Sequence, residues 1–551
     1  MQTIYWNGSI VTMEQESDAP EAVLVREGKI AGVGSLKEVQ AEAEAMGASV
    51  QMVDLGGKTL MPAFTDAHSH LSMTAKMSTA ADLSSCESLE EIIETLKQYK
   101  LEHQLTKEDV LYGNGYDHNF LPGEQHPTKE YLNQVSEEIP IYVAHVSGHM
   151  GCANDAALKQ AGITKDTKDP DGGVIGRVAG SMEPNGYLEE AGMIGMQEFL
   201  GLRMKIDMDQ AIHDAQKLYL QYGVTTVQDG ATDESIIELF KQMGEKGNLS
   251  VDVVAYPLLV YQGQEVLNKN PDYVGTYRNH LKLGGYKAIL DGSPQGKSAW
   301  LTKPYEESGD YCGYPWFQDE EVLAFMKTAV DDNRQILVHC NGDAAMDQYL
   351  RCYRQALEES TNPEKDKLRP VMIHCQTIRD DQLDQMVALH MIPSIFVGHV
   401  YYWGDVHQKN LGEERGKRIS PCESAFKKGL CVNFHQDTPV TKPDMLHSVW
   451  CAVNRVTRNG SLLDPQQVCS VYDALKAVTI HAAYAYYEED SKGSIREGKV
   501  ADLVILDQNP LTVEPMKIRD IRVLATIKDG KTVYTCAESF WKLPEEAQSE
   551  S

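Results

Sequence analysis

The middle of the chain alternates between short apolar runs and longer stretches with helical periodicity. Such alternation is typical of βα units whose strands build a parallel sheet. It predicts an α/β fold, and a (β/α)8 barrel of the TIM type would use eight of the runs as strands. Ten runs compete for these places: Thr59–Ala67, Val110–Gly113, Ile141–His145, Val224–Asp229, Val251–Leu259, Gly285–Leu290, Gln335–Cys340, Pro370–Cys375, Ile392–Val397 and Cys431–Phe434.

Both ends of the chain show a different pattern, in which short strand-like runs are joined by tight turns. Asn7-Gly8 and Asp529-Gly530 are typical turn sequences of β-hairpins. We expect the two ends to meet in one small sheet domain, although a separate domain at each end would give the same pattern. The strand candidates are Thr3–Tyr5, Ser9–Thr12, Ala22–Arg26 and Lys29–Val33 near the start, and Ala501–Asp507, Val523–Lys528 and Lys531–Cys536 near the end.

The surplus of strand candidates suggests an insertion in the barrel at roughly 116–202. Within it, the run Lys168–Gly186 is rich in Gly, Pro and Asp and predicts a long loop. Long loops on a compact fold often act as lids over a site. The Glu/Ser-rich tail at 541–551 is expected to be flexible.

Charge and cysteine content narrow the class of protein. The 551 residues carry 51 basic and 81 acidic side chains, for a formal net charge of −30. A strongly acidic surface repels phosphate backbones and anionic lipids, so we expect neither nucleic acid nor a membrane as a partner.

Eleven cysteines without a CxxC pair indicate free thiols in a reducing compartment. Without a signal-peptide pattern or a long apolar span, the sequence predicts a cytoplasmic protein.

Residues of the kinds that bind metals follow several of the apolar runs. The first run continues into Asp66-Ala67-His68-Ser69-His70. Residues i and i+2 of a strand project to the same face, so His68 and His70 can bind one cation, and neutral imidazole suits zinc. Taken alone, an HxH pair is a weak signal.

Four further candidates stand on or near the ends of later runs: Lys287, His339, His374 and Asp437. Each alone has an ordinary alternative, namely an exposed strand lysine, two core histidines and the N-cap of a helix. The C-terminal ends of all strands in a parallel barrel meet at one mouth, where TIM-type barrels carry their active sites. The order HxH, Lys, His, His and Asp along the chain is therefore far more specific than any one member.

With this constellation the chain resembles the amidohydrolase superfamily. Within it, the chain is similar to amidohydrolase family 3, the branch of N-substituted formamide deformylase-like proteins. The resemblance covers nearly the whole chain, although Ser298 stands where the branch more often has Thr. It rests on the runs Leu60–His70, Gly148–Asn154, Gly223–Val227, His339–Ala345, His435–Val440 and Gly498–Val504.

The resemblance implies a domain organisation and a metal site. The barrel would span 59–487, and residues 1–58 and 488–540 would form one discontinuous β-sandwich. One or two divalent ions would bind, with zinc favoured, and Lys287 would be carboxylated if two metals bind. The implied ligands are His68, His70, Lys287, His339, His374 and Asp437.

We therefore hypothesise a metal-dependent hydrolase that cleaves a carbon–nitrogen bond of a small molecule: an amide, an N-formyl or N-acyl group, or a cyclic amide. The metal would activate water, Asp437 would act as general base and acid, and a metal or a nearby histidine such as His149 would stabilise the oxyanion. The alternatives are a deaminase or a lactone or ester hydrolase on the same site and, in a different class, a non-catalytic scaffold; a homodimer is left open. The candidates for substrate contact are Asp117, His118, Arg177 and Trp403.

Overall fold

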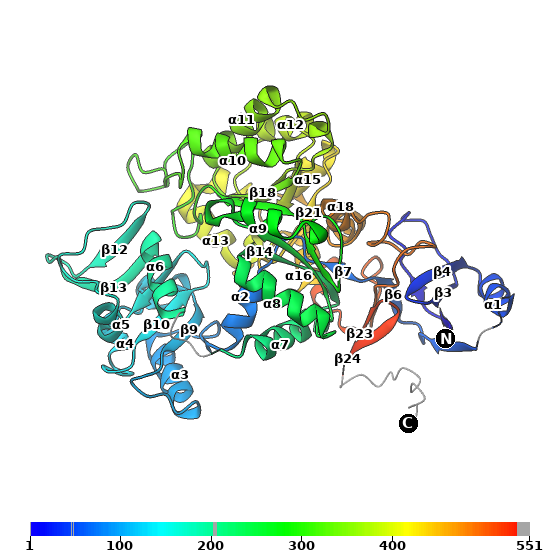
Figure 1. Cartoon of the computed structure of the whole chain (residues 1–551), viewed down its shortest axis with the longest axis horizontal. Helices are drawn as coiled ribbons and strands as arrows, with labels where there is room; N and C mark the ends of the chain where they lie inside the picture. Colours follow the sequence, from blue (N-terminus) through cyan, green and yellow to red (C-terminus); the bar gives the residue numbers. More distant parts are fainter. Residues whose placement is uncertain (1, 46, 48, 202–205, 537–551) are drawn as a thin grey trace.

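The computed structural model describes residues 2–45, 47, 49–201 and 206–536. Figure 1 shows a central barrel, a sheet with helices at one end (cyan) and small sheets from both ends of the chain (blue and red) at the other. The tail predicted to be flexible, 541–551, lies outside the described residues.

The central part is a barrel with eight parallel strand positions, which confirms the predicted (β/α)8 fold. The two halves of the ring join through the parallel bridge between Leu258 and Lys287. Beyond the strand ends, the His70 N–H donates to the Thr438 carbonyl at 2.8 Å and closes the ring. β16 (Leu281–Leu283) and β17 (Gly285–Ile289) follow each other and together fill one position. The other seven positions are filled by β7 (Phe64–Thr65), β14 (Val224–Thr232), β15 (Asp252–Pro257), β18 (Gln335–Cys340), β19 (Val371–His374), β20 (Ile392–Ile395) and β21 (Asn433–Phe434).

Three of the ten strand candidates lie wholly or partly outside the barrel, as a surplus over eight places implies. Two of them, observed as β9 (Leu111–Tyr116) and β10 (Ile141–His145), lie in the insertion and not in the barrel. The first candidate divides at Ala63 into β6 (Thr59–Pro62), which joins a terminal sheet, and β7 of the barrel. An apolar run indicates a buried strand but carries no information about which sheet the strand joins.

Helices cover the outside of the barrel, and α8 (Glu234–Glu245) shows why they form. The Asp233 carboxylate accepts the Ile236 N–H at 3.0 Å, and the apolar face with Ile237 and Phe240 is buried. The other helices of this part are α2 (Leu71–Ser78), α7 (Met208–Gln221), α9 (Gly263–Lys269), α10 (Asp319–Asp331), α11 (Asp343–Glu359), α12 (Asp380–Ala388), α13 (His399–Leu411), α14 (Glu413–Lys417), α15 (Cys422–Lys427), α16 (Met445–Asn454), α17 (Val471–Ala477) and α18 (Ile480–Ala485).

The insertion is a six-stranded sheet in the order β12-β13-β11-β10-β9-β8. Four of these strands lie within the predicted range of 116–202, while β8 and most of β9 precede it. The predicted long loop contains β12 and the first residues of β13. The remaining elements are β8 (Ala81–Asp82), β11 (Met150–Ala153), β12 (Gly173–Arg177), β13 (Pro184–Glu190), α3 (Leu89–Glu102), α4 (Lys129–Leu132), α5 (Asp155–Gln160) and α6 (Ala191–Gly201).

The two ends of the chain build two small sheets with a common core, as the sequence predicts. One sheet has the order β4-β3-β1-β5, and the other, β2-β6-β22-β23-β24, combines strands from both ends. Tyr5 and Val53 of the first sheet and Leu503 and Ile527 of the second belong to one apolar cluster. The domain boundaries themselves stay a prediction. The elements are β1 (Gln2–Trp6), β2 (Ser9–Ile10), β3 (Ala22–Arg26), β4 (Lys29–Gly34), α1 (Leu36–Ala45), β5 (Val50–Asp54), β22 (Leu503–Leu506), β23 (Val523–Lys528) and β24 (Lys531–Thr535).

Within the described ranges, no helix combines the length and the apolar character that crossing a bilayer requires.

Candidate metal centre

The histidine pair lies just beyond the first barrel strand. His68 follows β7 by a few residues, and His70 is the N-cap of α2. His68 Nδ1 lies 2.5 Å from Gln228 Oε1, and His70 Nδ1 donates to the Gly230 carbonyl. Because each Nδ1 donates its hydrogen to a fixed acceptor, each Nε2 keeps a free lone pair, as a metal ligand requires.

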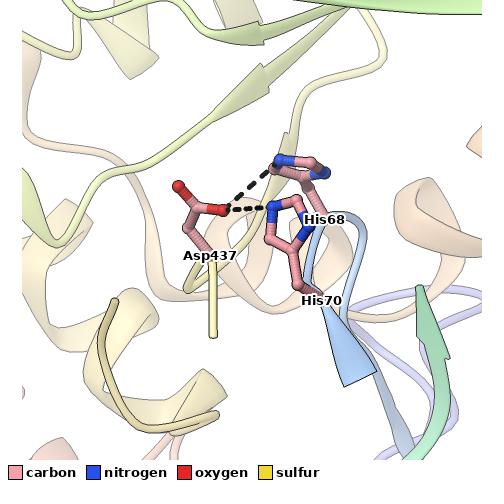
Figure 2. A group of neighbouring side chains, drawn as sticks. All are labelled: His68, His70 and Asp437. Atoms are coloured by element: carbon pink, nitrogen blue, oxygen red, sulfur yellow. Dashed lines mark ion pairs between the residues drawn. The ribbon is translucent and has the colours of Figure 1, made fainter. Parts of the chain in front are cut away.

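Asp437 reaches the histidine pair from the last barrel strand. Figure 2 shows its carboxylate facing both imidazoles, with Oδ1 at 3.4 Å from His68 Nε2 and 3.2 Å from His70 Nε2. Among the described residues, this buried oxygen has no hydrogen-bond partner. A divalent cation between the two imidazoles and the carboxylate would satisfy all three, so these residues fit a metal.

Three further candidates extend this group. Lys287 Nζ lies 3.3 Å from His68 Nε2, and His374 Nε2 lies 3.9 Å from Asp437 Oδ2. His339 Nδ1 lies 3.0 Å from His374 Nε2. The structure thus brings all six predicted ligands into one continuous group on, or just beyond, the barrel strands.

Burial gives these side chains the protonation states that metal binding needs. It lowers the pKa of His68, His339 and His374 well below the usual value for histidine. Burial also lowers the pKa of Lys287 from 10.5 to about 7. A neutral imidazole has a lone pair for a cation, and a neutral amine can react with CO2, whereas their protonated forms can do neither.

Two of the six residues have a backbone conformation that non-glycine residues rarely adopt. The φ angle is 77° at His374 and 54° at Asp437, in the left-handed region. Such conformations persist where the surrounding structure holds them, and they cluster at functional sites. Both residues with this unfavourable backbone conformation are candidate metal ligands.

A second group of possible ligands lies in the insertion. Asp117, His118 and His145 place ligand atoms within 4.8 Å of one another. However, the Ser147 backbone N–H donates to His145 Nδ1 at 3.0 Å, so His145 carries its hydrogen on Nε2. This Nε2 faces Asp117 Oδ1 at 3.3 Å and His118 Nδ1 at 3.0 Å. In this arrangement the three side chains form a hydrogen-bond network.

Asp117 also joins the insertion to the barrel. The Trp403 indole N–H, on α13, donates to Asp117 Oδ2 at 2.9 Å, and both side chains are buried. They border a cavity of about 560 Å³ whose wall includes Thr438, the residue after Asp437. Two residues predicted to contact substrate thus line a space beside the metal centre.

The other predicted residues have different surroundings. The His149 ring lies 5.5 Å from the ring of His339, between centroids, and so lies beside the candidate ligands. The Arg177 guanidinium, on β12, donates to the carbonyls of Thr167 and Met182 within the insertion. The structure does not bring Arg177 to the metal centre.

Sequence reasoning missed two residues of this region. His435 Nε2 lies 3.1 Å from His374 Nδ1. The sequence contained an indication that His435 belongs to the site, because His435 precedes Asp437 by two residues, the same spacing as in the HxH pair. Glu190, whose Oε2 lies 3.0 Å from His149 Nδ1, had no such signal, because it lies on an antiparallel strand of the insertion.

Comparison with known proteins places this geometry in a family context. A sequence model of the amidohydrolase family matches residues 51–534. YtcJ of Bacillus subtilis (strain 168) is 28% identical over 97% of this chain and 99% of its own length. The N-substituted formamide deformylase of Arthrobacter pascens is 25% identical over 96% of this chain and 97% of its own.

A solved structure has the same fold over nearly its whole length. An uncharacterized metal-dependent hydrolase from Pyrococcus horikoshii OT3 superposes with a TM-score of 0.74 at 25% identity, covering 94% of this chain and 99% of its own.

Proposed function

Because the chain belongs to the amidohydrolase family and is a metal-dependent hydrolase of that superfamily, we propose that it cleaves the carbon–nitrogen bond of an amide. The substrate is an N-formyl, N-acyl or cyclic amide of a small molecule. The observation that carries this proposal is the convergence of His68, His70 and Asp437 with three further candidate ligands at the barrel mouth.

The proposed metal ligands are the six residues grouped there. The donor set of imidazole nitrogens and carboxylate oxygens suits zinc. For a second ion, the neutral Lys287 amine adds to CO2 with loss of one proton, which forms an N–C bond and leaves an anionic carboxylate on the side chain. The oxygens of this carboxylate would then be available as ligands for the two cations.

The chain's own residues have three tasks in the reaction. A bound divalent metal lowers the pKa of a coordinated water and polarises a carbonyl oxygen. Asp437 accepts the proton of the attacking water and delivers it to the leaving nitrogen, which becomes an amine. His149 donates a hydrogen bond to the oxyanion, and Gln228 and Gly230 hold the tautomers of the two histidines.

The similarity to a deformylase supports a small acyl group as the group removed. That protein is named for N-substituted formamides, and the alignment spans nearly all of both chains. The net charge of −30 supports a small-molecule substrate over nucleic acid.

The test is elemental analysis of the purified chain beside His68→Ala/His70→Ala, followed by assays with a panel of N-formyl and N-acyl amides. We expect one to two equivalents of zinc or a similar metal in the wild type and a loss of most of it in the double variant. His103→Ala, which changes an exposed histidine, should keep the metal and the activity. Wild-type protein that stays metal-free after reconstitution with zinc and bicarbonate would contradict the proposal.

Asp437→Asn tests the proton-transfer role. The amide cannot accept a proton at neutral pH, so kcat should fall by about 10³-fold or more while the melting temperature changes little. Steady-state kinetics with the metal retained measure this. Full turnover by the variant would remove Asp437 from its role as base.

A further inference from the structure

The partner of His149 is a buried glutamate that none of the proposed chemistry uses. We propose that Glu190 is a positioning residue, whose carboxylate holds the His149 imidazole in place for the oxyanion. This inference rests on the proposed function, in which His149 contacts the reacting carbonyl.

Glu190 and His149 are fixed to each other twice. Glu190 is the last residue of β13, and its backbone N–H donates to the His149 carbonyl at 3.0 Å. Its Oε2 lies 3.0 Å from His149 Nδ1. The backbone N–H of His149 also donates to Ser147 Oγ at 3.3 Å. Main chain and ring are therefore held together, which leaves the ring little freedom to rotate.

The direction of this contact determines which ring atom faces the centre. Because the Glu190 carboxylate can only accept, His149 Nδ1 carries a hydrogen. The other ring nitrogen, Nε2, then lies away from Glu190, with the His339 ring 5.5 Å away between centroids. To donate to the oxyanion, Nε2 must carry a hydrogen as well, so in this role His149 is the imidazolium, protonated on both nitrogens. A carboxylate that fixes the orientation of a catalytic imidazole is a recurrent arrangement in enzymes.

Burial of Glu190 argues against a role in stability. The side chain is 0% exposed, and within the described part of the chain its Oε1 has no hydrogen-bond partner. Burying a carboxylate with a single partner is unfavourable, so a side chain chosen for stability alone would be apolar. Residues that break this rule are expected mainly at functional sites.

Glu190 also touches the barrel itself. A Cβ atom added at Gly292 would lie 2.4 Å from Glu190 Oε1, so the carboxylate packs against the backbone of the loop after β17. The Gly292 carbonyl accepts from Asn341 Nδ2 at 2.8 Å and lies 3.3 Å from His339 Nε2. The carboxylate therefore lies between the insertion and the loop whose Gly292 carbonyl contacts His339.

A double-mutant cycle on the metal-loaded, full-length chain tests this role. His149→Ala should lower kcat about 100-fold, as the loss of one oxyanion donor does. Glu190→Ala should lower kcat about 10- to 100-fold with KM within about threefold, because it acts through the imidazole. The variant with both changes should lose no more than His149→Ala alone. Losses that multiply would show that Glu190 acts independently of His149 and would overturn the proposal.

Two further variants separate positioning from folding. Glu190→Gln keeps an oxygen that can accept from His149 Nδ1, so it should recover most of the lost kcat. Glu189→Ala is the matched control on the same strand, where the carboxylate accepts from the Tyr187 and Tyr314 hydroxyls. It should leave kcat within about threefold of wild type. A loss in Glu189→Ala equal to that in Glu190→Ala would indicate only a structural effect on β13 and overturn the proposal.

A crystal structure provides a readout that needs no substrate. In metal-loaded Glu190→Ala the His149 ring should leave its wild-type position, whereas in Glu190→Gln it should stay. A ring that stays in place in Glu190→Ala would overturn the proposal. If the wild type hydrolyses no amide, the proposed function fails, but the position of the ring still decides whether Glu190 orients His149.

Discussion

Lys287 differs from the surface lysines of this protein in its surroundings. It lies on β17 with 1% of its surface exposed, and its Nζ faces the Nε2 of His68. A buried ammonium ion in this place would face an imidazole and compete with a metal for the same space. The lowered pKa of Lys287 avoids this conflict, because the amine is neutral through much of the physiological range.

The pKa of Lys287 predicts how the metal-free protein takes up its metals. Burial lowers this pKa from 10.5 to about 7, so below that pH the amine is protonated and cannot attack CO2. At constant dissolved CO2 and zinc, the rate of carboxylation should rise about tenfold per pH unit and level off above about pH 7. Carbon-13 NMR of the carbamate formed from labelled bicarbonate measures this rate.

Lys287→Arg is the control for that experiment, because a guanidinium stays protonated and should form no carbamate at any pH. A wild-type rate that does not change between about pH 6 and pH 8 would contradict the assigned pKa.

At the scale of elements, the histidine pair depends on how α2 begins. The Asp229 carboxylate, on β14, accepts the Ser72 N–H at 2.7 Å and the Ser72 hydroxyl at 3.2 Å. His70, the N-cap of this helix, forms a backbone bridge with Asp229 as well. A carboxylate from the neighbouring barrel strand thus fixes the first turn of α2 and the residue that precedes it.

Asp229→Ala should therefore weaken both the helix and the metal site. The loss of a helix cap costs about 1 kcal/mol of unfolding free energy, and the displaced His70 should lower metal affinity about 10- to 100-fold. Denaturant unfolding and competition with a chelator measure the two effects.

Asp233→Ala provides a matched comparison. Asp233 caps α8 through the Ile236 N–H at 3.0 Å but contacts no candidate ligand. It should cost a similar free energy and leave metal affinity unchanged. Equal losses of affinity in both variants would contradict a specific link between Asp229 and His70.

The sequence alone predicted the elements that obey a periodic rule. His68 and His70 share a face through the period of a strand, and Asp437 follows an apolar run that has the length of a strand. Glu190 could not be placed in this way. Its partner His149 is brought beside it by antiparallel pairing within the insertion, and register between distant strands is set by tertiary contacts. For the same reason, the division of the run Thr59–Ala67 between two sheets was not predictable.

At the scale of the whole molecule, buried charges connect the terminal sheets to the barrel. Lys528, the last residue of β23, lies 2.9 Å from Asp252 Oδ2 and 3.2 Å from Asp502 Oδ2. Asp252 begins β15 of the barrel and also lies 2.5 Å from Lys492 Nζ. Burial alone would raise the pKa of Asp252, but Lys492 and Lys528 hold it well below the usual value. The stability gained is therefore present above the ordinary carboxyl pKa and is lost as pH falls through the lowered one.

Lys528→Met should destabilise the whole chain. Removing Lys528 takes a cation away from two buried carboxylates, Asp252 and Asp502, although Lys492 still pairs with Asp252. We expect a cost of about 3 kcal/mol of unfolding free energy. Denaturant unfolding at neutral pH measures this cost. Lys531→Met, which changes an exposed lysine on β24, should stay within about 0.5 kcal/mol of wild type. A similar small effect for Lys528→Met would show that the network does not hold the parts together.

The composite terminal sheet also has a consequence for biosynthesis. β6 pairs with β2 on one side and with β22 on the other, where Leu60 lies opposite Ile505. Only Ala63 separates β6 from β7, which leads to the histidine pair. While the ribosome is still making the barrel, this segment lacks the partner strand that comes near the end of the chain. β6 is therefore paired on both sides only after synthesis of β22, so we expect the segment that leads to the histidine pair to be fully held only after the whole barrel has been made.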